Sequence, residues 1–216
     1  MSEVPDASGD QSSRWAGVLR SLVLPLVLLA VILGGLWYWD SRGDGGGTND
    51  DYGVVELPEA KNPTGRSAAP EVGRAGPDFV LEQPGSGTLR LSDLQGQPVL
   101  INFWATWCPP CRAEIPELVA AYERYRDEGL VIVAVNLQES NGQVLEFAEE
   151  FGMTFPIVID RDGDVANVWR LGGPIEGIPT SYFLDETGVI RSFFYGPMTK
   201  DSLEERLADV LPREAS

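Results

Sequence analysis

The 216-residue sequence contains no histidine and only two cysteines, Cys108 and Cys111. The absence of histidine excludes Ser-His and Cys-His nucleophile pairs and every zinc site built on imidazole. Two cysteines cannot form a four-thiolate zinc site either, so only a carboxylate-based metal site survives this count. We therefore assign neither a metal nor another cofactor to the chain.

Basic residues are also scarce, with 16 Lys and Arg against 33 Asp and Glu and a formal net charge of −17. Proteins that bind nucleic acid neutralise phosphates with clustered Lys and Arg, which this chain lacks. No nucleic-acid partner is expected. The hydrophobic content of 43% is nevertheless ordinary for a chain with a packed core.

Charge is absent from residues 21–39, and Leu22 to Trp39 reads LVLPLVLLAVILGGLWYW. A helix of this length spans most of a hydrocarbon core of about 30 Å. A cleaved signal peptide is the alternative, but this run is longer than a usual signal core and ends in bulky residues. We predict an uncleaved single-pass anchor over residues 21–39. Arg14 and Arg20 before it, against Arg42 after it, favour a cytoplasmic tail (1–20) and an extracytoplasmic remainder at the cell membrane.

Residues 40–75 are rich in Gly, Pro and acidic side chains and show no period of 2 or 3.6. This composition predicts a flexible acidic linker. Residues 76–216 then form one domain of ordinary size.

Strand-like and helix-like patterns alternate within residues 76–216. Predicted strands are FVLEQ and TLRL as a hairpin, VLINFWA, LVIVAVNL, FPIVID, and SYFLD with VIRSFFY as a second antiparallel pair. Apolar residues at helical spacing predict three helices: one after the cysteines, one after LVIVAVNL and one near the C-terminus. In the last of these, Ser202 and Glu205 are spaced as a capping box. The order predicts an α/β fold with a mixed central β-sheet flanked by helices.

Cys108 falls where a buried strand ends and a helix begins, so free N–H groups point at its sulfur and favour the reactive thiolate. Pro109 and Pro110 suit the first helical turn because they have no N–H to lose. Cys111 shares the apolar helix face and should be the more buried sulfur. The spacing favours a redox-active disulfide over an inert one, with Cys108 attacking and Cys111 resolving.

These residues resemble the thioredoxin superfamily, and more closely its membrane-anchored, extracytoplasmic TlpA/ResA-like branch. The motifs are GPDF, LSDLQGQPVLINFWATWCPPCRAEIPEL, FPIVID and GIPTSYFLD. The resemblance implies a thioredoxin-like fold, dithiol-disulfide exchange with client proteins and a membrane electron donor or acceptor. It also implies a cis peptide bond before Pro179. Asn102 departs from the buried Asp of thioredoxins proper, so proton handling must differ.

Candidate site residues extend beyond the cysteines. Glu114, three residues after Cys111, matches a carboxylate that this branch places near the thiols; on a helix the two side chains are neighbours. It is interpreted as a proton acceptor with a raised pKa, the alternative being a solvated surface carboxylate. Client binding is assigned to Trp107, Pro109, Pro110, Ile178 and Pro179, whereas Trp104 is expected in the core.

The leading function is a thiol-disulfide oxidoreductase that acts as a reductant, for example on the haem-attachment thiols of apocytochrome c. The alternatives are an oxidant that installs disulfides, a thiol peroxidase and a non-catalytic tethered domain. The peroxidase is disfavoured because Ile101 and Ala105 stand where peroxiredoxins usually carry Pro and Thr or Ser. The Asp-rich stretch at residues 160–164 lacks the Gly and bidentate Glu of a calcium loop and is interpreted as a turn.

Overall fold

The computed structural model describes Leu29 and residues 31–34, 52–169 and 177–211. The chain divides into two compact units, Met1–Asn49 and Asp50–Ser216. In the first unit the described residues are helical and exposed. None of the helices in the described part of the chain is long and apolar enough to cross a membrane. The predicted tail (1–20), most of the predicted anchor (21–39) and the start of the predicted linker (40–51) lie outside the described residues.

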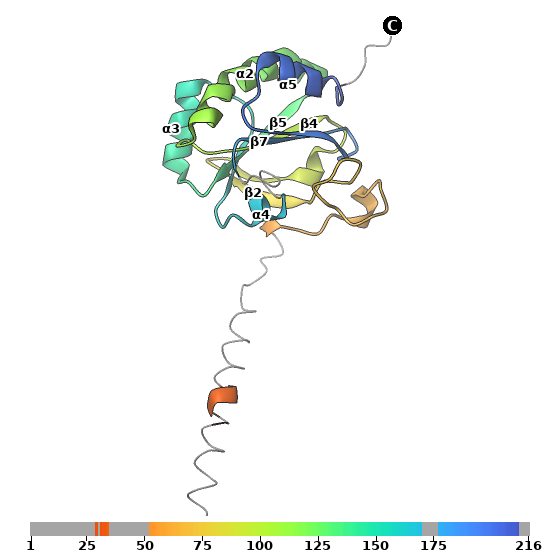
Figure 1. The fold of residues 1–216 in the computed structure, drawn as a ribbon, viewed down its shortest axis with the longest axis vertical. Coiled ribbons are helices and arrows are strands. Elements are labelled where there is room, and N and C mark those ends of the chain that lie inside the picture. The colour runs from red at the N-terminus through yellow and green to blue at the C-terminus, as the bar shows by residue number, and fades with distance from the viewer. Residues whose placement is uncertain (1–28, 30, 35–51, 170–176, 212–216) are drawn as a thin grey trace, which may run out of the picture. The chain divides into compact units, whose positions relative to one another are not determined.

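An eight-stranded mixed sheet forms the centre of the second unit (Figure 1). Its order is β1-β2-β6-β5-β4-β7-β8, with β3 paired to β2. The β4–β5 and β5–β6 pairs are parallel, and both predicted hairpins, β2–β3 and β7–β8, are present as antiparallel pairs. The strands are β1 (Gly53–Val54), β2 (Phe79–Gln83), β3 (Gly87–Arg90), β4 (Val99–Trp104), β5 (Val131–Leu137), β6 (Ile157–Asp160), β7 (Thr180–Leu184) and β8 (Ile190–Tyr195).

Helices cover both faces of this sheet, with α2 and α5 on one side and α4 on the other in Figure 1. The predicted mixed sheet flanked by helices is therefore confirmed. Short 3-10 turns connect several elements. The helices are α2 (Pro109–Tyr125), α3 (Asn141–Phe151), α4 (Asp164–Val168) and α5 (Lys200–Leu207), with 3-10 turns η1 (Glu59–Lys61), η2 (Leu91–Leu94) and η3 (Arg126–Glu128).

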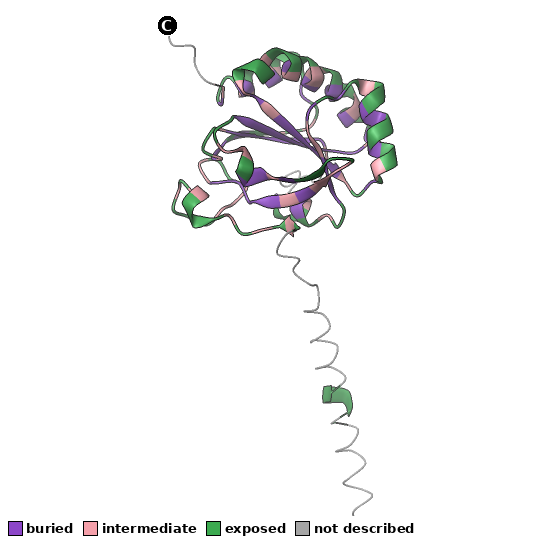
Figure 2. Ribbon diagram, turned by 180° about the vertical axis from the view of Figure 1, so that it is seen from behind, coloured by how far each residue is buried: buried purple, intermediate pink, exposed green. Residues whose placement is uncertain are grey.

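Strand β4 is buried along its whole length, as a continuous apolar run in a sheet covered on both faces requires. Leu100 and Trp104 join one apolar cluster with α2, α3 and α5, whereas Ile101 and Phe103 join a second cluster on the opposite face. Figure 2 shows the central strands as buried and the outer sides of the helices as exposed. This buried strand leads into the cysteine segment.

Residues 52–75 correct the predicted linker, because they pack as part of the second unit. Strand β1 pairs with β2. Lys61 Nζ donates a hydrogen bond to Ser92 O at 2.8 Å and forms a salt bridge with Asp93 Oδ1 at 2.7 Å. The segment is held by a two-residue strand and by isolated polar side chains such as Lys61. Neither produces a repeating hydrophobic pattern in the sequence. The prediction of a flexible linker up to residue 75 was therefore wrong for residues 52–75.

Two local predictions also have outcomes. The last helix begins earlier than predicted. Its N-cap is Thr199, which forms a capping box with Ser202, whereas the sequence predicted a capping box of Ser202 with Glu205. The Asp-rich stretch is a turn into α4, as predicted, and Asp160 accepts the backbone N–H of Ala166 at 2.8 Å. Burial raises the pKa of this Asp160 carboxyl.

Candidate active site

Cys108 and Cys111 are joined by a disulfide at the start of α2. Cys108 is the N-cap residue, and its sulfur accepts the backbone N–H of Cys111 at 3.2 Å. Pro109 and Pro110 occupy the first helical turn, where the missing N–H groups have no intrahelical partner to lose. The sequence predicted this strand-to-helix placement, and the structure confirms it.

The two sulfur-bearing residues differ little in exposure while oxidised. Cys108 is 3% exposed and Cys111 is 0% exposed, so the predicted order holds, although both are buried. Trp107 beside them is 67% exposed, and Pro109 and Pro110 are exposed as well. An exposed apolar rim therefore lies beside the disulfide.

A second loop completes this rim from the other side. The Ile178–Pro179 peptide bond is cis, and Ile178 O lies 3.6 Å from Cys108 Sγ. The disulfide sulfur has no proton, so this contact becomes a hydrogen bond only when Cys108 is a thiol. Ile178 is half-buried and Pro179 is buried, and Pro179 O accepts the N–H of Gly196 at 2.9 Å. The structure thus brings all of the predicted client-binding residues around the disulfide.

Glu114 is buried one turn after Cys111, with an exposure of 1%. Its Oε1 accepts the Asn102 amide at 2.8 Å, and its Oε2 accepts the Met198 N–H at 3.0 Å. Burial raises the pKa of this carboxyl to about 7, and the two hydrogen bonds oppose that rise. The alternative of a solvated surface carboxylate is wrong, and Glu114 can exchange a proton near neutral pH.

A second buried carboxylate, Glu139, was not predicted from the sequence. Its Oε2 accepts the Thr106 backbone N–H and the Asn136 amide, both at 2.7 Å, and its Oε1 accepts the Thr106 hydroxyl. Thr106 lies in the loop between β4 and Cys108, so Glu139 anchors the segment that leads into Cys108. A signal was available, because β4 and β5 were adjacent predicted strands and parallel neighbours end at the same edge of a sheet.

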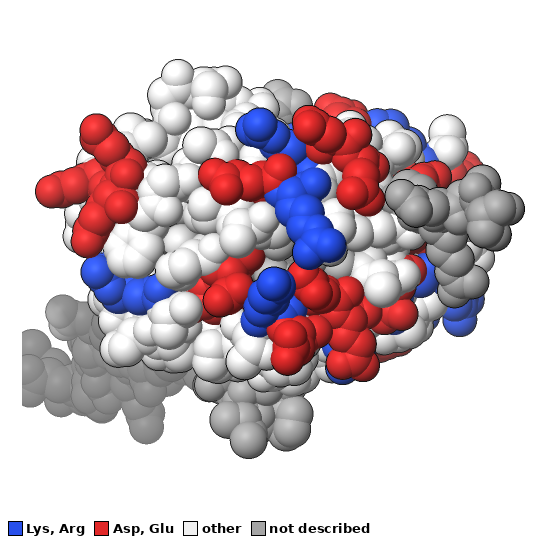
Figure 3. All heavy atoms as spheres, turned by 90° about the horizontal axis from the view of Figure 1, so that it is seen from above, with Lys and Arg blue, Asp and Glu red and all other residues white. Residues whose placement is uncertain are grey.

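Arg112 is the basic residue next to Cys111. Its Nη1 donates to Thr106 O at 3.4 Å, and its guanidinium lies 4.9 Å from the ring centres of both Phe147 and Phe151. Its charge is therefore held between the cysteine loop and α3. On the face shown in Figure 3, basic side chains are interspersed with acidic ones and do not form a continuous basic patch.

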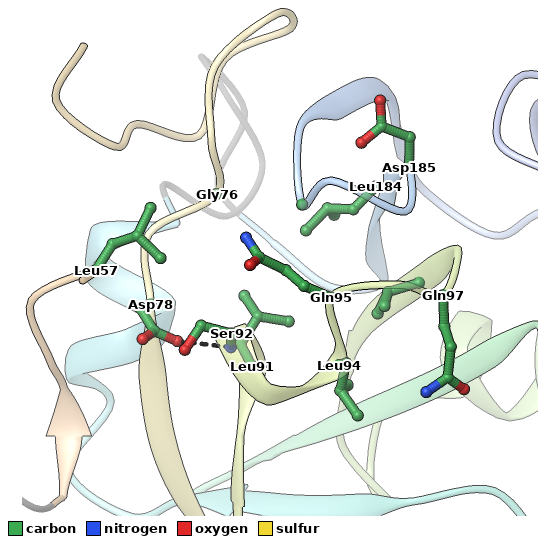
Figure 4. A pocket seen from close by; sticks show the side chains of 12 residues that line it. Leu57, Gly76, Asp78, Leu91, Ser92, Leu94, Gln95, Gln97, Leu184 and Asp185 are labelled. Carbon is green, nitrogen blue, oxygen red and sulfur yellow. Dashed lines mark hydrogen bonds between the residues drawn. The ribbon is translucent and has the colours of Figure 1, made fainter. Parts of the chain in front are cut away.

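The pocket shown in Figure 4 lies away from this chemistry. It is lined by Val99 and Leu184, which pair at the start of β4, whereas Cys108 follows the other end of that strand. Its buried Asp78 already pairs with Arg90 at 2.8 Å and accepts the Ser92 N–H at 2.9 Å. We therefore place the reaction at the disulfide and not in this pocket.

Comparison with known proteins identifies related chains over this region. The profile of the AhpC/TSA family matches residues 72–193. The thiol-disulfide oxidoreductase ResA of Geobacillus kaustophilus is 42% identical over 141 residues, covering 65% of this chain and 79% of that protein. The solved structure of StoA from Bacillus subtilis is 33% identical with a TM-score of 0.51, covering 60% of this chain and 96% of StoA. A thioredoxin-family thiol:disulfide interchange protein from Chlorobium tepidum is 26% identical with a TM-score of 0.58, covering 64% and 96%.

Proposed function

The chain belongs to the AhpC/TSA family and is a thiol-disulfide oxidoreductase with a thioredoxin-like fold, and we propose that it reduces client disulfides through Cys108 and Cys111. The observation that carries the assignment of roles is the position of Cys108 as the N-cap of α2. Helix N-termini stabilise a thiolate, which is the nucleophilic form of cysteine. Cys111, fully buried behind it, is suited to resolving an intermediate and not to meeting a client.

The proposed reaction begins with the reduced protein. The Cys108 thiolate attacks one sulfur of the client disulfide, a Cys108–client bond forms, and the other client sulfur leaves as a thiolate and takes up a proton. Cys111 then loses its proton and attacks Cys108, which forms the Cys108–Cys111 disulfide and releases the second client thiol. The client gains two electrons, and a dithiol donor must return them to the protein.

Glu114 supports the second half of this sequence as the proton acceptor for Cys111. The two residues are one helical turn apart, and the carboxyl is shielded from water. Because its pKa of about 7 lies near working pH, Glu114 can take up the proton and release it again.

The proposed client surface consists of Trp107, Pro109, Pro110, Ile178 and Pro179. Trp107, Pro109 and Pro110 are exposed, Ile178 is half-buried and Pro179 is buried, and apolar and aromatic groups around a reactive atom are typical of sites that bind peptide segments. We propose C-x-x-C-H segments of apocytochrome c as clients, because the resemblance to the ResA-like branch suggests them. A strong oxidant is the alternative, but the Pro109–Pro110 insert lacks the cation that would stabilise a reduced oxidant.

A thiol peroxidase has weaker support. Ile101 and Ala105 occupy the positions where peroxiredoxins usually carry Pro and a hydroxyl residue, and both are fully buried apolar side chains. No hydroxyl therefore stands at either position to position a peroxide beside Cys108.

We also propose that residues 21–39 anchor the chain in the cell membrane with the catalytic domain outside the cytoplasm. The uncharged run and the arginines before it support this arrangement. Alkaline phosphatase fused after Ser216 should be active, and the same fusion with residues 1–39 deleted should not be. The reverse result would contradict the orientation.

The reductase assignment is tested with the full-length protein and a disulfide-bonded C-x-x-C-H peptide. We expect the dithiol-reduced protein to reduce the peptide and to accumulate the Cys108–Cys111 disulfide in equal amount. A protein that instead oxidises the reduced peptide, starting from its own disulfide and going to completion, would establish the oxidant alternative.

A further inference from the structure

Asn102 is a polar side chain in the middle of β4, a strand that is buried along its whole length. It is 0% exposed on β4, between Leu100 and Trp104, which face the same apolar cluster under α2. Its cross-strand partner is Ser181 on β7. Burying an amide at such a position is unfavourable unless its polar atoms are paired.

Only the nitrogen of the Asn102 amide forms hydrogen bonds. Asn102 Nδ2 donates to Glu114 Oε1 at 2.8 Å and to Ser181 Oγ at 2.9 Å. Asn102 Oδ1 is buried and has no hydrogen-bond partner. A side chain placed only to hold the strands together would be expected to satisfy both ends, because an unpaired buried acceptor is costly. The arrangement favours the contact with Glu114 at the expense of the amide oxygen.

Both hydrogen-bond partners of the Glu114 carboxyl are donors. One oxygen faces the Asn102 amide and the other faces the Met198 N–H. An ionised carboxylate accepts hydrogen bonds only, whereas a protonated carboxyl must also donate one. The hydrogen bonds to Glu114 therefore favour its anionic form, against the effect of burial.

We propose that Asn102 is a positioning residue for disulfide exchange: its amide holds the Glu114 carboxylate as an anion, aimed and ready to accept the proton of the Cys111 thiol. The inference rests on the proposed function of Cys111 and Glu114. When Cys111 attacks Cys108, the Cys111 proton passes to Glu114, and no other bond changes in that transfer.

The pKa of Glu114 agrees with this geometry. Burial raises it and the contacts from Met198 and Asn102 lower it, while no charged side chain among the described residues is one of its causes. Its hydrogen-bond partners come from β4 (Asn102) and from the segment before α5 (Met198), Ser181 on β7 contacts Asn102, and Cys111 precedes Glu114 by three residues on α2. After reduction, the Cys111 thiol is the titratable group one helical turn from Glu114.

The unpaired amide oxygen gives Asn102 a role after the transfer as well. Rotating the Asn102 amide by half a turn exchanges the positions of Oδ1 and Nδ2. The acceptor Oδ1 then occupies the place of Nδ2, which lies 2.8 Å from Glu114 Oε1. The protonated Glu114 can then donate to it, and the Ser181 hydroxyl can do the same. In that orientation the amide N–H groups lose their acceptors, which opposes protonation and helps Glu114 to release its proton again.

The test follows thionitrobenzoate release from an aromatic disulfide added to the reduced full-length protein. The first release reports attack by Cys108, and the second reports resolution by Cys111. For Asn102→Leu we expect the pH midpoint of the second phase to rise by about one unit, a roughly tenfold change in proton affinity, with the first phase unchanged. Asn102→Asp should shift the midpoint in the same direction.

Two matched variants separate positioning from structure. Ser181→Ala removes the other partner of Asn102 without touching Glu114 and should leave the midpoint within about half a unit. In a Glu114→Gln background, itself slower in resolution by roughly tenfold or more, Asn102→Leu should have no further effect on the pH profile. An unchanged midpoint in both Asn102 variants, or equal slowing of both phases at every pH, would overturn the proposal. Absence of a second phase in the unaltered protein would instead overturn the proposed function.

Discussion

The Cys108 sulfur accepts the backbone N–H of Cys111 at 3.2 Å, so Cys108, the proposed attacking residue, is also the N-cap of α2. The same helix end that fixes its position also favours its thiolate. The two cysteines consequently have different environments although only two residues separate them.

Because their environments differ, serine substitutions at Cys108 and at Cys111 should have different effects. Cys108→Ser should abolish disulfide reduction, and Cys111→Ser should trap a mixed disulfide between Cys108 and the client, because the resolving thiol is missing. Non-reducing gels and mass spectrometry of the trapped species check both outcomes. Trapping through Cys111 in a Cys108→Ser protein would reverse the assigned roles.

Glu114 predicts a pH dependence of stability in the oxidised protein. Its pKa is raised from 4.5 to about 7, so its contribution is fully present below pH 4.5 and is lost as the pH rises through 7. The free energy of unfolding should fall by about 3 kcal/mol over this range relative to Glu114→Gln. Denaturant titrations of both proteins from pH 4 to 8 provide the comparison; a difference that does not change with pH would place the Glu114 pKa at its ordinary value.

Trp107 predicts a separation between client binding and redox chemistry. Since its ring is 67% exposed, Trp107→Ala should leave stability and reduction potential unchanged. The kcat/KM for a C-x-x-C-H peptide should fall roughly tenfold, as for loss of an aromatic anchor at a binding surface. Turnover of glutathione disulfide is the control and should change little. Equal loss with both substrates would contradict a client-binding role.

Glu139 predicts a contrast between two substitutions. Glu139→Ala leaves the Thr106 N–H and the Asn136 amide without an acceptor and should destabilise the protein by about 2–4 kcal/mol. Glu139→Gln can keep one oxygen for these donors and turn its amide toward the Thr106 hydroxyl, so most of the stability should remain. Thermal unfolding distinguishes them, and equal stability of the two variants would show that Glu139 does not anchor the loop.

Much of the fold could be predicted because strong local patterns specify it. The apolar runs of β4 and β5 and the stripes of α2 and α3 have clear periods, and Cys108 to Pro110 is a recognisable helix start. The segment at 52–75 could not be predicted, because single anchors such as Lys61 leave no period. The hydrogen bond between Asn102 and Glu114 could not be predicted either, because these two side chains become partners only when β4 and α2 pack together.

The reduction potential of the full-length protein tests the central claim, that this pair serves as a reductant. The N-terminal end of α2 favours the Cys108 thiolate, but Pro109–Pro110 adds no cation between the cysteines, and the nearby buried carboxylates Glu114 and Glu139 add no positive charge, so the extra stabilisation typical of a strong oxidant is missing. Equilibration with glutathione buffers should give a value nearer ≈ −270 mV, as for thioredoxin, than the ≈ −120 mV of a strong oxidant. A value above about −160 mV would contradict the account and assign the chain to disulfide formation.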